Sequence, residues 1–369
     1  MRRHAVRPVA LLLLLAAAGC RPSQPIPVGF VAGLTGRHYD LGISSRNGAT
    51  LAVEELNAAG GVEGRPLELR VRDDRQDPQA AREAVTGLIG EGVVAIVGHV
   101  TSTMAVETLP IADREHVLML SPTVSSAALA GRDDWLVTLH PSTAVAAHAV
   151  AAWLSAHRPV HRVAAIIDLS NRAFSESWRD QFAGQLQEHG GELIRSIAFT
   201  SGEGVMLRTP VAEALDAQPD AVLVIANALD TAALCQLIRR RSADVLILGS
   251  DWGFTQDVIA HGGQAVEGAI FTQRIDLEAR EPDLVRFRQA YVARFGRPAD
   301  FAAAQSYEAV QMLARALRRD PTREGVRRAI LQANDYAGLR GDLRIDATGD
   351  AQRRQLISTI RGGRIMVLE

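Results

Sequence analysis

Short apolar runs alternate with longer amphipathic stretches in the first part of the chain. The runs are six to eight residues long, which is typical of strands, and the stretches between them have the apolar spacing of helices. Strands separated by helices favour right-handed crossovers and a parallel sheet covered on both faces. The strand-like runs are residues 27–34, 67–74, 93–98 and 117–122, and the helix-like stretches are residues 42–59, 77–90 and 102–115.

The same alternation begins again near residue 145 and predicts a second sheet of the same kind. A chain of 369 residues is long enough for two such α/β lobes. The strand-like runs are residues 162–170, 192–200, 219–228, 244–253 and 267–275, with helix-like stretches at 174–190, 205–218, 230–241, 281–295 and 301–318. Strand-like pieces at 341–346 and 354–369 end the chain.

Two local patterns specify where individual elements lie. Asp77 followed by Pro78 is typical of an N-cap and the first position of a helix. Residues 67–74 alternate apolar and polar side chains, which predicts a strand at an exposed edge of its sheet.

The first 20 residues have the pattern of an export signal. A basic start precedes an apolar run that is too short to span a membrane. Residues 17–20, AAGC, resemble the lipobox of bacterial lipoproteins, with Ala17 where that motif usually has leucine. We therefore expect a signal peptide over 1–20, a lipid on Cys20 and a tether over 21–25. The alternative is an ordinary secretory signal in which Cys20 is incidental.

Charge and cysteine content narrow the classes of partner. The formal net charge is −2 and the arginines are scattered, which argues against a nucleic-acid-binding surface. Apart from Cys20, the chain has only Cys235, so no internal disulfide is expected. The spacing of Cys235 suits a buried helix face, and we interpret it as a core thiol.

Three predicted strand ends carry unusual polar residues. Thr101, Ser102 and Thr103 follow one strand, hydroxyl residues in 120–126 follow another, and Asp251 follows a strand of the second sheet. In open parallel sheets, ligands bind beyond the carboxyl ends of the strands. Hydroxyls and free N–H groups at a helix start suit a carboxylate, and a buried acid suits an ammonium group.

Each of these features also has a simpler interpretation. Serine and threonine at helix starts often serve only as N-caps, and Asp251 can cap the turn that follows it. Trp252 is either a core side chain or a wall beside the polar site. Only the coincidence of three polar strand ends favours a binding site for a zwitterion between the lobes.

The sequence offers little support for an enzyme. It has no nucleophile elbow, Walker A sequence, zinc-protease motif or Cys/His metal cluster, so we predict no cofactor and no metal. The glycines before residue 93 precede their strand, which makes a dinucleotide-binding turn a poor fit. A Ser–His pairing of His99 with the nearby hydroxyls is a weak alternative.

The chain from about Ile26 onward resembles the periplasmic branched-chain amino-acid-binding proteins that feed ABC transporters. The resemblance is carried by residues 33–74, 95–103, 117–126, 249–253 and 307–317. It implies the type I periplasmic binding fold, in which two Rossmann-like lobes are joined by three crossovers. Lobe 1 would comprise 26–143 and 275–335, and lobe 2 would comprise 144–274 and 336–369.

The same resemblance implies a set of ligand contacts. Ser102 would hold the ligand carboxylate, and Asp251 would bind the α-ammonium group. The other implied contacts are Val100 and Thr101 as walls, Thr123 and Ser125 as polar contacts, Phe174 as an aromatic cover, Asn227, and a loop from Tyr39 to Leu41.

This chain departs from the better-known members of the family. The disulfide near the hydroxyl cluster is absent, because Thr101 is among the residues at the corresponding positions. Phe174 and the segment around Asn227 replace tyrosines of lobe 2, and Asp251 is one methylene shorter than glutamate. These differences weaken the expectation of leucine-like specificity.

The resemblance implies a solute-binding lipoprotein in the periplasm or at the cell surface. Its partners would be an amino acid or related carboxylate, a membrane permease, and the membrane itself through the lipid. The alternative is a ligand-sensing subunit of a signalling system that uses the same fold, and the sequence does not distinguish transport from sensing.

Overall fold

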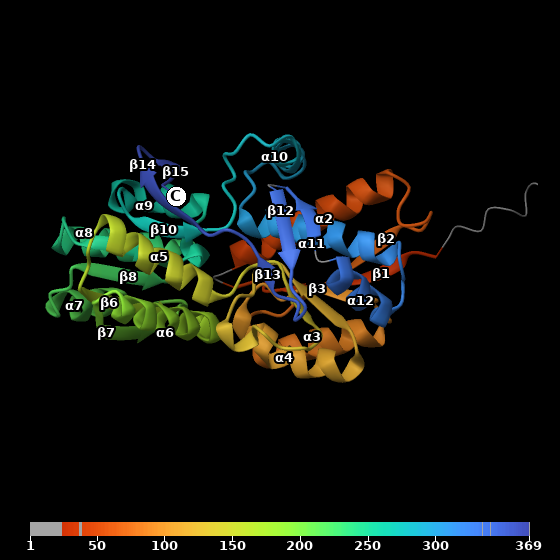
Figure 1. Cartoon of the computed structure of the whole chain (residues 1–369), viewed down its shortest axis with the longest axis horizontal. Helices are drawn as coiled ribbons and strands as arrows, with labels where there is room; N and C mark the ends of the chain where they lie inside the picture. The colour runs from red at the N-terminus through yellow and green to blue at the C-terminus, as the bar shows by residue number, and fades with distance from the viewer. Residues whose placement is uncertain (1–23, 37–38, 334, 340, 369) are drawn as a thin grey trace, which may run out of the picture.

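Two α/β lobes lie side by side in the computed structural model (Figure 1). The structure describes residues 24–36, 39–333, 335–339 and 341–368. The expected signal peptide and Cys20 lie outside the described residues, and so does most of the expected tether.

Lobe 1 is built on a parallel sheet with the strand order β2-β1-β3-β4-β5. The position of β2 at its edge confirms the expectation from its alternating sequence. The strands are β1 (Ile26–Ala32), β2 (Leu67–Asp73), β3 (Ala95–Gly98), β4 (Leu118–Ser121) and β5 (Leu136–Thr138). The helices are α2 (Tyr39–Ala58), α3 (Pro78–Gly90), α4 (Ser102–Glu115), α10 (Pro282–Phe295), α11 (Phe301–Leu317) and α12 (Arg323–Ala333), with the 3-10 turn η1 (Ala127–Leu129).

Lobe 2 is built on a seven-stranded sheet with the order β15-β14-β10-β9-β8-β6-β7. Strands β6 to β10 are parallel, whereas β14 and β15 are antiparallel. The strands are β6 (Arg162–Asp168), β7 (Glu192–Phe199), β8 (Ala221–Ile225), β9 (Leu246–Gly249), β10 (Ile270–Gln273), β14 (Leu356–Arg361) and β15 (Arg364–Val367). The helices are α5 (Thr143–His157), α6 (Arg172–Glu188), α7 (Arg208–Asp216), α8 (Ala228–Arg241) and α9 (Gln256–Gly262), with the 3-10 turns η2 (Leu169–Asn171), η3 (Asp251–Gly253) and η4 (Gly263–Val266).

The chain passes between the lobes three times, after β5, after β10 and before β14. This arrangement confirms the expected two-lobed α/β fold. The predicted cap of α3 is also confirmed, because Asp77 accepts a hydrogen bond from the amide of Ala80 at 2.8 Å and Pro78 opens the helix. Cys235 is fully buried, and burial raises the pKa of its thiol to about 12.

A small third sheet differs from the expected division of the chain. It consists of β11 (Asp335–Gly338), β12 (Gly341–Ile345) and β13 (Ala351–Gln352), all antiparallel. Residues 336–353 were expected in lobe 2, but they attach to lobe 1. The amide of Thr138 donates to the carbonyl of Gly349 at 2.9 Å, and the amide of Leu339 donates to Glu308 at 2.7 Å. The chain joins the lobe 2 sheet only from β14 onward.

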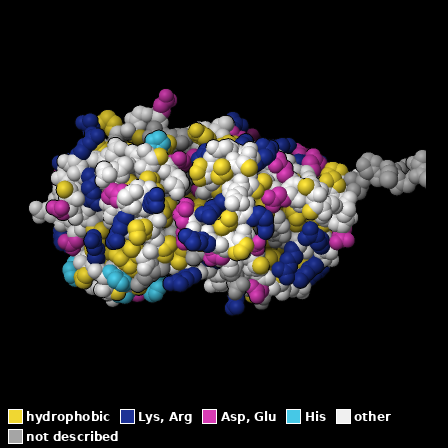
Figure 2. Space-filling model, turned by 90° about the horizontal axis from the view of Figure 1, so that it is seen from above, with side chains coloured by type: hydrophobic (Ala, Val, Ile, Leu, Met, Phe, Trp, Pro, Cys, Tyr) yellow, Lys and Arg dark blue, Asp and Glu magenta, His cyan; other side chains and the backbone are white. Residues whose placement is uncertain are grey.

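Basic and acidic side chains are interspersed on the face of the molecule seen from above (Figure 2). No extended field of one sign is visible on this face, which agrees with the small net charge.

Helices α2 and α11 pack closely against each other in lobe 1. Gly48 on α2 lies against the main chain of α11, and a Cβ atom at this position would overlap the carbonyl of Ala303. Because main chain cannot yield as a flexible side chain does, this position requires glycine.

We expect Gly48→Ala to lower the free energy of unfolding by about 1–3 kcal/mol through overpacking. Urea unfolding followed by circular dichroism measures the change. The control is Gly87→Ala on α3, where the added methyl group meets nothing within 4 Å and should raise stability by about 0.5–1 kcal/mol. Equal effects of the two substitutions would contradict the proposed packing constraint.

Candidate functional site

A small cavity lies between the two lobes, at the carboxyl ends of β3, β4 and β9. Its volume is about 20 Å³, which is room for about one water molecule. It is lined by Leu41, Val100, Ser102, Thr123, His140, Asn171, Phe174, Asp251, Trp252 and Phe301. Seven of the expected contacts are therefore brought together here, namely Leu41, Val100, Ser102, Thr123, Phe174, Asp251 and Trp252.

Ser102 is placed by the start of α4 and by the loop that follows β4. Its Oγ accepts hydrogen bonds from the amides of Ser125 and Ser126, both at 3.3 Å. A hydroxyl has two acceptor lone pairs and one hydrogen to donate. Because two amides already face the lone pairs, the hydroxyl hydrogen remains available for an acceptor in the cavity.

The other expected residues of lobe 1 hold this arrangement in place. Thr123 Oγ1 donates to the carbonyl of Val100 at 2.7 Å and so joins the ends of β3 and β4. Thr101 is buried at the N-cap position of α4, without a side-chain capping bond. Ser125 is buried as well, but its contribution is the amide that supports Ser102 and not a surface of the cavity.

Asp251 reaches the cavity from lobe 2 and contacts an imidazole that was not expected. Its Oδ2 lies 2.5 Å from Nε2 of His140, and the two residues are 5% and 2% exposed. Oδ1 of Asp251 is buried and has no hydrogen-bond partner among the described residues. One carboxylate oxygen of Asp251 is therefore in contact with His140, and the other has no hydrogen-bond partner among the described residues.

Arg274, directly after β10, completes this cluster. Its Nε–H donates to Nε2 of His140 at 3.3 Å, and its Nη2 donates to the carbonyls of Pro141 and Ser142 at 3.1 and 3.4 Å. Burial lowers the pKa of Arg274 to about 10, which leaves the guanidinium charged near neutral pH.

Opposing effects act on the pKa values of the pair. Burial lowers the pKa of His140, whereas its hydrogen bond to Asp251 favours the protonated ring. Burial by itself would raise the pKa of Asp251. The hydrogen bond and charge of His140, together with the charge of Arg274, outweigh that effect and hold the pKa below its usual value.

Aromatic rings form the apolar wall of the cavity. Phe174 and Trp252 meet edge to face, with ring centroids 5.8 Å apart and an interplanar angle of 82°. Phe301 lies against His140 with a centroid distance of 6.1 Å. Rings in these positions suit a flat or branched apolar body of a ligand.

Two expected contacts lie elsewhere. Asn227 is the N-cap of α8, where it accepts from the amide of Asp230 at 3.0 Å and donates to the Asp230 carboxylate at 2.7 Å. Tyr39 is 51% exposed and lies in an outer groove between the lobes, near Thr255 and Arg297. Both side chains are outside the residues that line the inner cavity.

Sequence reasoning missed His140, Asn171 and Phe301. His140 follows the short strand β5 at a crossover, and Phe301 opens α11 far along the chain. Asn171 precedes α6 and was available as a polar residue at a helix start. No local sequence pattern marked His140 or Phe301 as site residues, because only the fold brings them to the cavity.

His99 takes no part in a Ser–His pair. Its ring is fully buried, and its Nδ1 lies 2.7 Å from Oδ2 of Asp74. The hydroxyl of Ser121 instead contacts the main-chain carbonyl of His99, at 2.7 Å.

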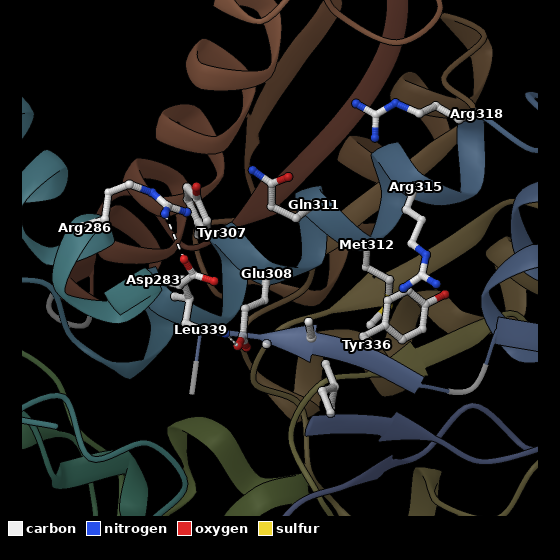
Figure 3. Close-up of a pocket in the computed structure, with 13 residues that line it drawn as sticks. Asp283, Arg286, Tyr307, Glu308, Gln311, Met312, Arg315, Arg318, Tyr336 and Leu339 are labelled. Carbon is white, nitrogen blue, oxygen red and sulfur yellow. Dashed lines mark hydrogen bonds and ion pairs between the residues drawn. The ribbon is translucent and has the colours of Figure 1, made fainter. Parts of the chain in front are cut away.

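A larger cavity of about 350 Å³ lies in lobe 1, between α10, α11 and the strands β11 and β12 (Figure 3). The acids of this cavity are already paired, because Asp283 binds Arg286 at 2.8 Å and Glu308 binds Arg353 at 2.6 Å. We place the candidate site in the small cavity between the lobes. There the hydroxyl of Ser102 can still donate a hydrogen bond, and the buried Oδ1 of Asp251 has no partner among the described residues.

The described part of the chain offers neither a cluster of metal ligands nor a membrane-spanning helix. No group of three or more His, Cys, Asp or Glu residues there could hold a metal ion. Within the same residues, no helix combines the length and apolar character needed to cross a membrane.

Hydrogen bonds join the two lobes beside the cavity. Oδ1 of Asn171, at the start of α6, accepts from the amide and the hydroxyl of Thr103 on α4, at 3.2 and 3.3 Å. The hydroxyl of Thr103 in turn accepts from the amide of Ala173 at 3.1 Å. These bonds connect the beginnings of two helices from different lobes.

Comparisons with known proteins agree with this architecture. A family model described as "Periplasmic binding protein" matches residues 25–364. The Leu/Ile/Val-binding protein BraC3 of Rhizobium johnstonii is 27% identical over 301 residues, which are 78% of this chain and 77% of that protein.

Two solved structures share the fold. The leucine-binding protein LivK from Thermotoga maritima has a TM-score of 0.85 at 24% identity, covering 93% of this chain and 98% of that chain. A solute-binding protein of an ABC transporter from R. palustris, in complex with benzoate, has a TM-score of 0.83 at 20% identity, covering 93% of this chain and 95% of that chain.

We expect Asn171→Ala to favour separation of the lobes. The substitution removes two hydrogen bonds, each worth about 0.5–1.5 kcal/mol, that exist only when the lobes are together. Small-angle X-ray scattering should show a larger radius of gyration. The control is Ser170→Ala, whose hydroxyl donates to Asp168 at 2.9 Å within lobe 2. Equal radii for both variants and the wild type would contradict a role for Asn171 in closure.

Proposed function

Because the chain belongs to the periplasmic binding protein family, we propose that it binds an amino acid or related small carboxylate between its lobes and delivers it to an ABC importer. As a member of this family it is a solute-binding protein and not an enzyme. The available hydroxyl of Ser102, supported by two main-chain amides, is the observation that carries the proposal.

The start of α4 is suited to a carboxylate. Ser102 lies at the first position of a 14-residue helix, where N–H groups without intrahelical partners and the helix dipole favour an anion. A ligand carboxylate would accept from the Ser102 hydroxyl while the amides of Ser125 and Ser126 keep that hydroxyl oriented. Hydrogen bonds of this charge-assisted kind contribute about 1.5–3 kcal/mol each.

Binding requires the lobes to separate and close again. The closed cavity has room for about one water molecule, so a ligand of amino-acid size needs more space than this arrangement leaves. Hinge closure around a ligand is a common mechanism in two-lobed proteins. The interlobe bonds of Asn171 would then form part of the closed, ligand-holding state.

Relatives support both amino acids and other acids as ligands. BraC3 carries the name of a Leu/Ile/Val-binding protein, whereas the R. palustris structure contains benzoate. These proteins have in common ligands with a carboxylate and an apolar body. The Ser102 hydroxyl and the rings of Phe174, Trp252 and Phe301 suit both of these parts.

We further propose that the protein is exported and held at a bacterial membrane by a lipid on Cys20. The support is the basic start, the apolar run and the AAGC sequence of residues 1–20. Anchoring would keep the binding protein close to its permease in the periplasm or at the cell surface.

We expect Ser102→Ala to weaken carboxylate binding by about tenfold to a hundredfold, since one charge-assisted hydrogen bond is lost. Isothermal titration calorimetry should be used, with the tightest ligand found among amino acids and small aromatic and aliphatic acids. The control is Thr108→Val on the same helix, because the hydroxyl of Thr108 donates to the carbonyl of Met104 and not into the cavity. Wild-type affinity in Ser102→Ala would contradict this role.

A further inference from the structure

Three consecutive main-chain amides in the loop after β4 connect the candidate carboxylate site to lobe 2. The amides of Ser125 and Ser126 both donate to Oγ of Ser102 at 3.3 Å. The next amide, that of Ala127, donates across the lobes to Oγ of Ser177 on α6 at 2.9 Å. The same short segment therefore contacts the hydroxyl expected to hold the ligand and a helix of the opposite lobe.

Ser177 is itself held in place by a second hydroxyl. Its Oγ lies 2.7 Å from Oγ1 of Thr143, which is the first residue of α5, directly after the first crossover. A hydroxyl oxygen has two lone pairs and one hydrogen. Ser177 can therefore accept from the amide of Ala127 with one lone pair and still share a hydrogen bond with Thr143.

Thr143 closes this arrangement into a ring of hydrogen bonds. Its amide donates to the carbonyl of Ser125 at 2.7 Å, while its hydroxyl contacts Ser177 and Ser177 in turn contacts Ala127. Ser125 is thus fixed at its amide by Ser102 and at its carbonyl by Thr143. A rotation of the loop that turned its amides away from Ser102 would also disturb the bonds to Thr143 and Ser177.

Both lobes contribute to this ring. Ser125 and Ala127 belong to lobe 1, whereas Thr143 and Ser177 lie on helices of lobe 2. Helix α6 also packs against α4 and η1 of lobe 1 (Figure 1). The ring is therefore complete only when the lobes have the relative position seen in this structure.

We propose that Ser177 is a positioning residue of the carboxylate site. By accepting from the amide of Ala127 when the lobes are together, it keeps the loop in the orientation in which the amides of Ser125 and Ser126 occupy the lone pairs of Ser102. The hydroxyl hydrogen of Ser102 is then directed to the ligand carboxylate. The inference rests on the proposed function, since it concerns the same ligand at the same hydroxyl.

This arrangement couples closure of the lobes to recognition of the carboxylate. Closing the lobes orients the Ser102 hydroxyl, and a carboxylate bound at that hydroxyl favours the orientation of the loop that α6 contacts. Coupling between two such equilibria is reciprocal. A ligand without a carboxylate gains less from closure.

We expect Ser177→Ala to weaken binding of the acid by about three- to tenfold, since it removes one hydrogen bond between the lobes. Isothermal titration calorimetry measures this with the acid that the wild-type protein binds most tightly among leucine, valine, phenylalanine, isovalerate and benzoate. The control is Ser175→Ala on the same helix, whose hydroxyl donates to the carbonyl of Asp168 within lobe 2 at 2.7 Å. This control should leave the affinity unchanged, and equal weakening by both substitutions would overturn the inference.

A double-mutant cycle tests whether Ser177 acts through Ser102. In Ser102→Ala the hydroxyl that the loop orients is gone, so adding Ser177→Ala should weaken binding by less than about twofold. Equal weakening in both backgrounds would mean that Ser177 only holds the lobes together, which would overturn its positioning role and leave the proposed function intact. Failure of the wild-type protein to bind any of these acids would overturn the proposed function and the inference with it.

A change of ligand tests the same coupling without altering Ser102. The carboxamide of the same acid also accepts from the hydroxyl, but a hydrogen bond to a neutral acceptor is about half as strong. Misalignment of the hydroxyl therefore costs the acid more than the carboxamide, and Ser177→Ala should reduce the preference for the acid by about threefold. An unchanged preference would contradict action through Ser102, and this comparison decides the question if Ser102→Ala does not fold.

Discussion

The buried carboxylate of Asp251 is the group on which the organisation of the interlobe region depends. A charge removed from water must be paired and hydrogen-bonded, and the partners here come from the crossovers between the lobes. His140 lies on the first crossover, and Arg274 begins the second. On the third, Arg353 pairs with Glu308 and lies close enough to influence Arg274. The segments that connect the lobes thus also supply the charged groups beside the cavity, and a movement of the lobes would change the surroundings of Asp251.

The opposite end of the cavity is built from neutral groups. Ser102 and the amides of Ser125 and Ser126 offer donors without a formal positive charge, and the rings of Phe174 and Trp252 lie between the two ends. A carboxylate held by neutral donors can be released when the lobes separate, because no buried counter-ion is left behind. This fixed pattern of neutral donors suits a protein that must bind a solute and then give it up.

Local sequence patterns predicted much of the fold but less of the site. The alternation of apolar runs and amphipathic stretches specified both sheets, because buried parallel strands and their covering helices have distinct periods. Ser102 and Asp251 were found because polar residues directly follow apolar strands. His140 and Phe301 could not be found in this way, since their roles arise only when a crossover and a distant helix meet at the cavity. The attachment of residues 336–353 to lobe 1 depends similarly on long-range hydrogen bonds to β5 and Glu308, which no local pattern encodes.

An acid at the position of Asp251 does not by itself identify the group that it binds. Taken alone, the side chain offers a negative charge and favours an ammonium group. With His140 against one of its oxygens and Arg274 beside the pair, the same side chain is an acceptor whose negative charge is already offset by a buried guanidinium. What the position selects therefore depends on residues that contact the acid from behind and need not touch the ligand. For this reason, the residues that contact Asp251 from behind must be considered together with it when the ligand class is inferred.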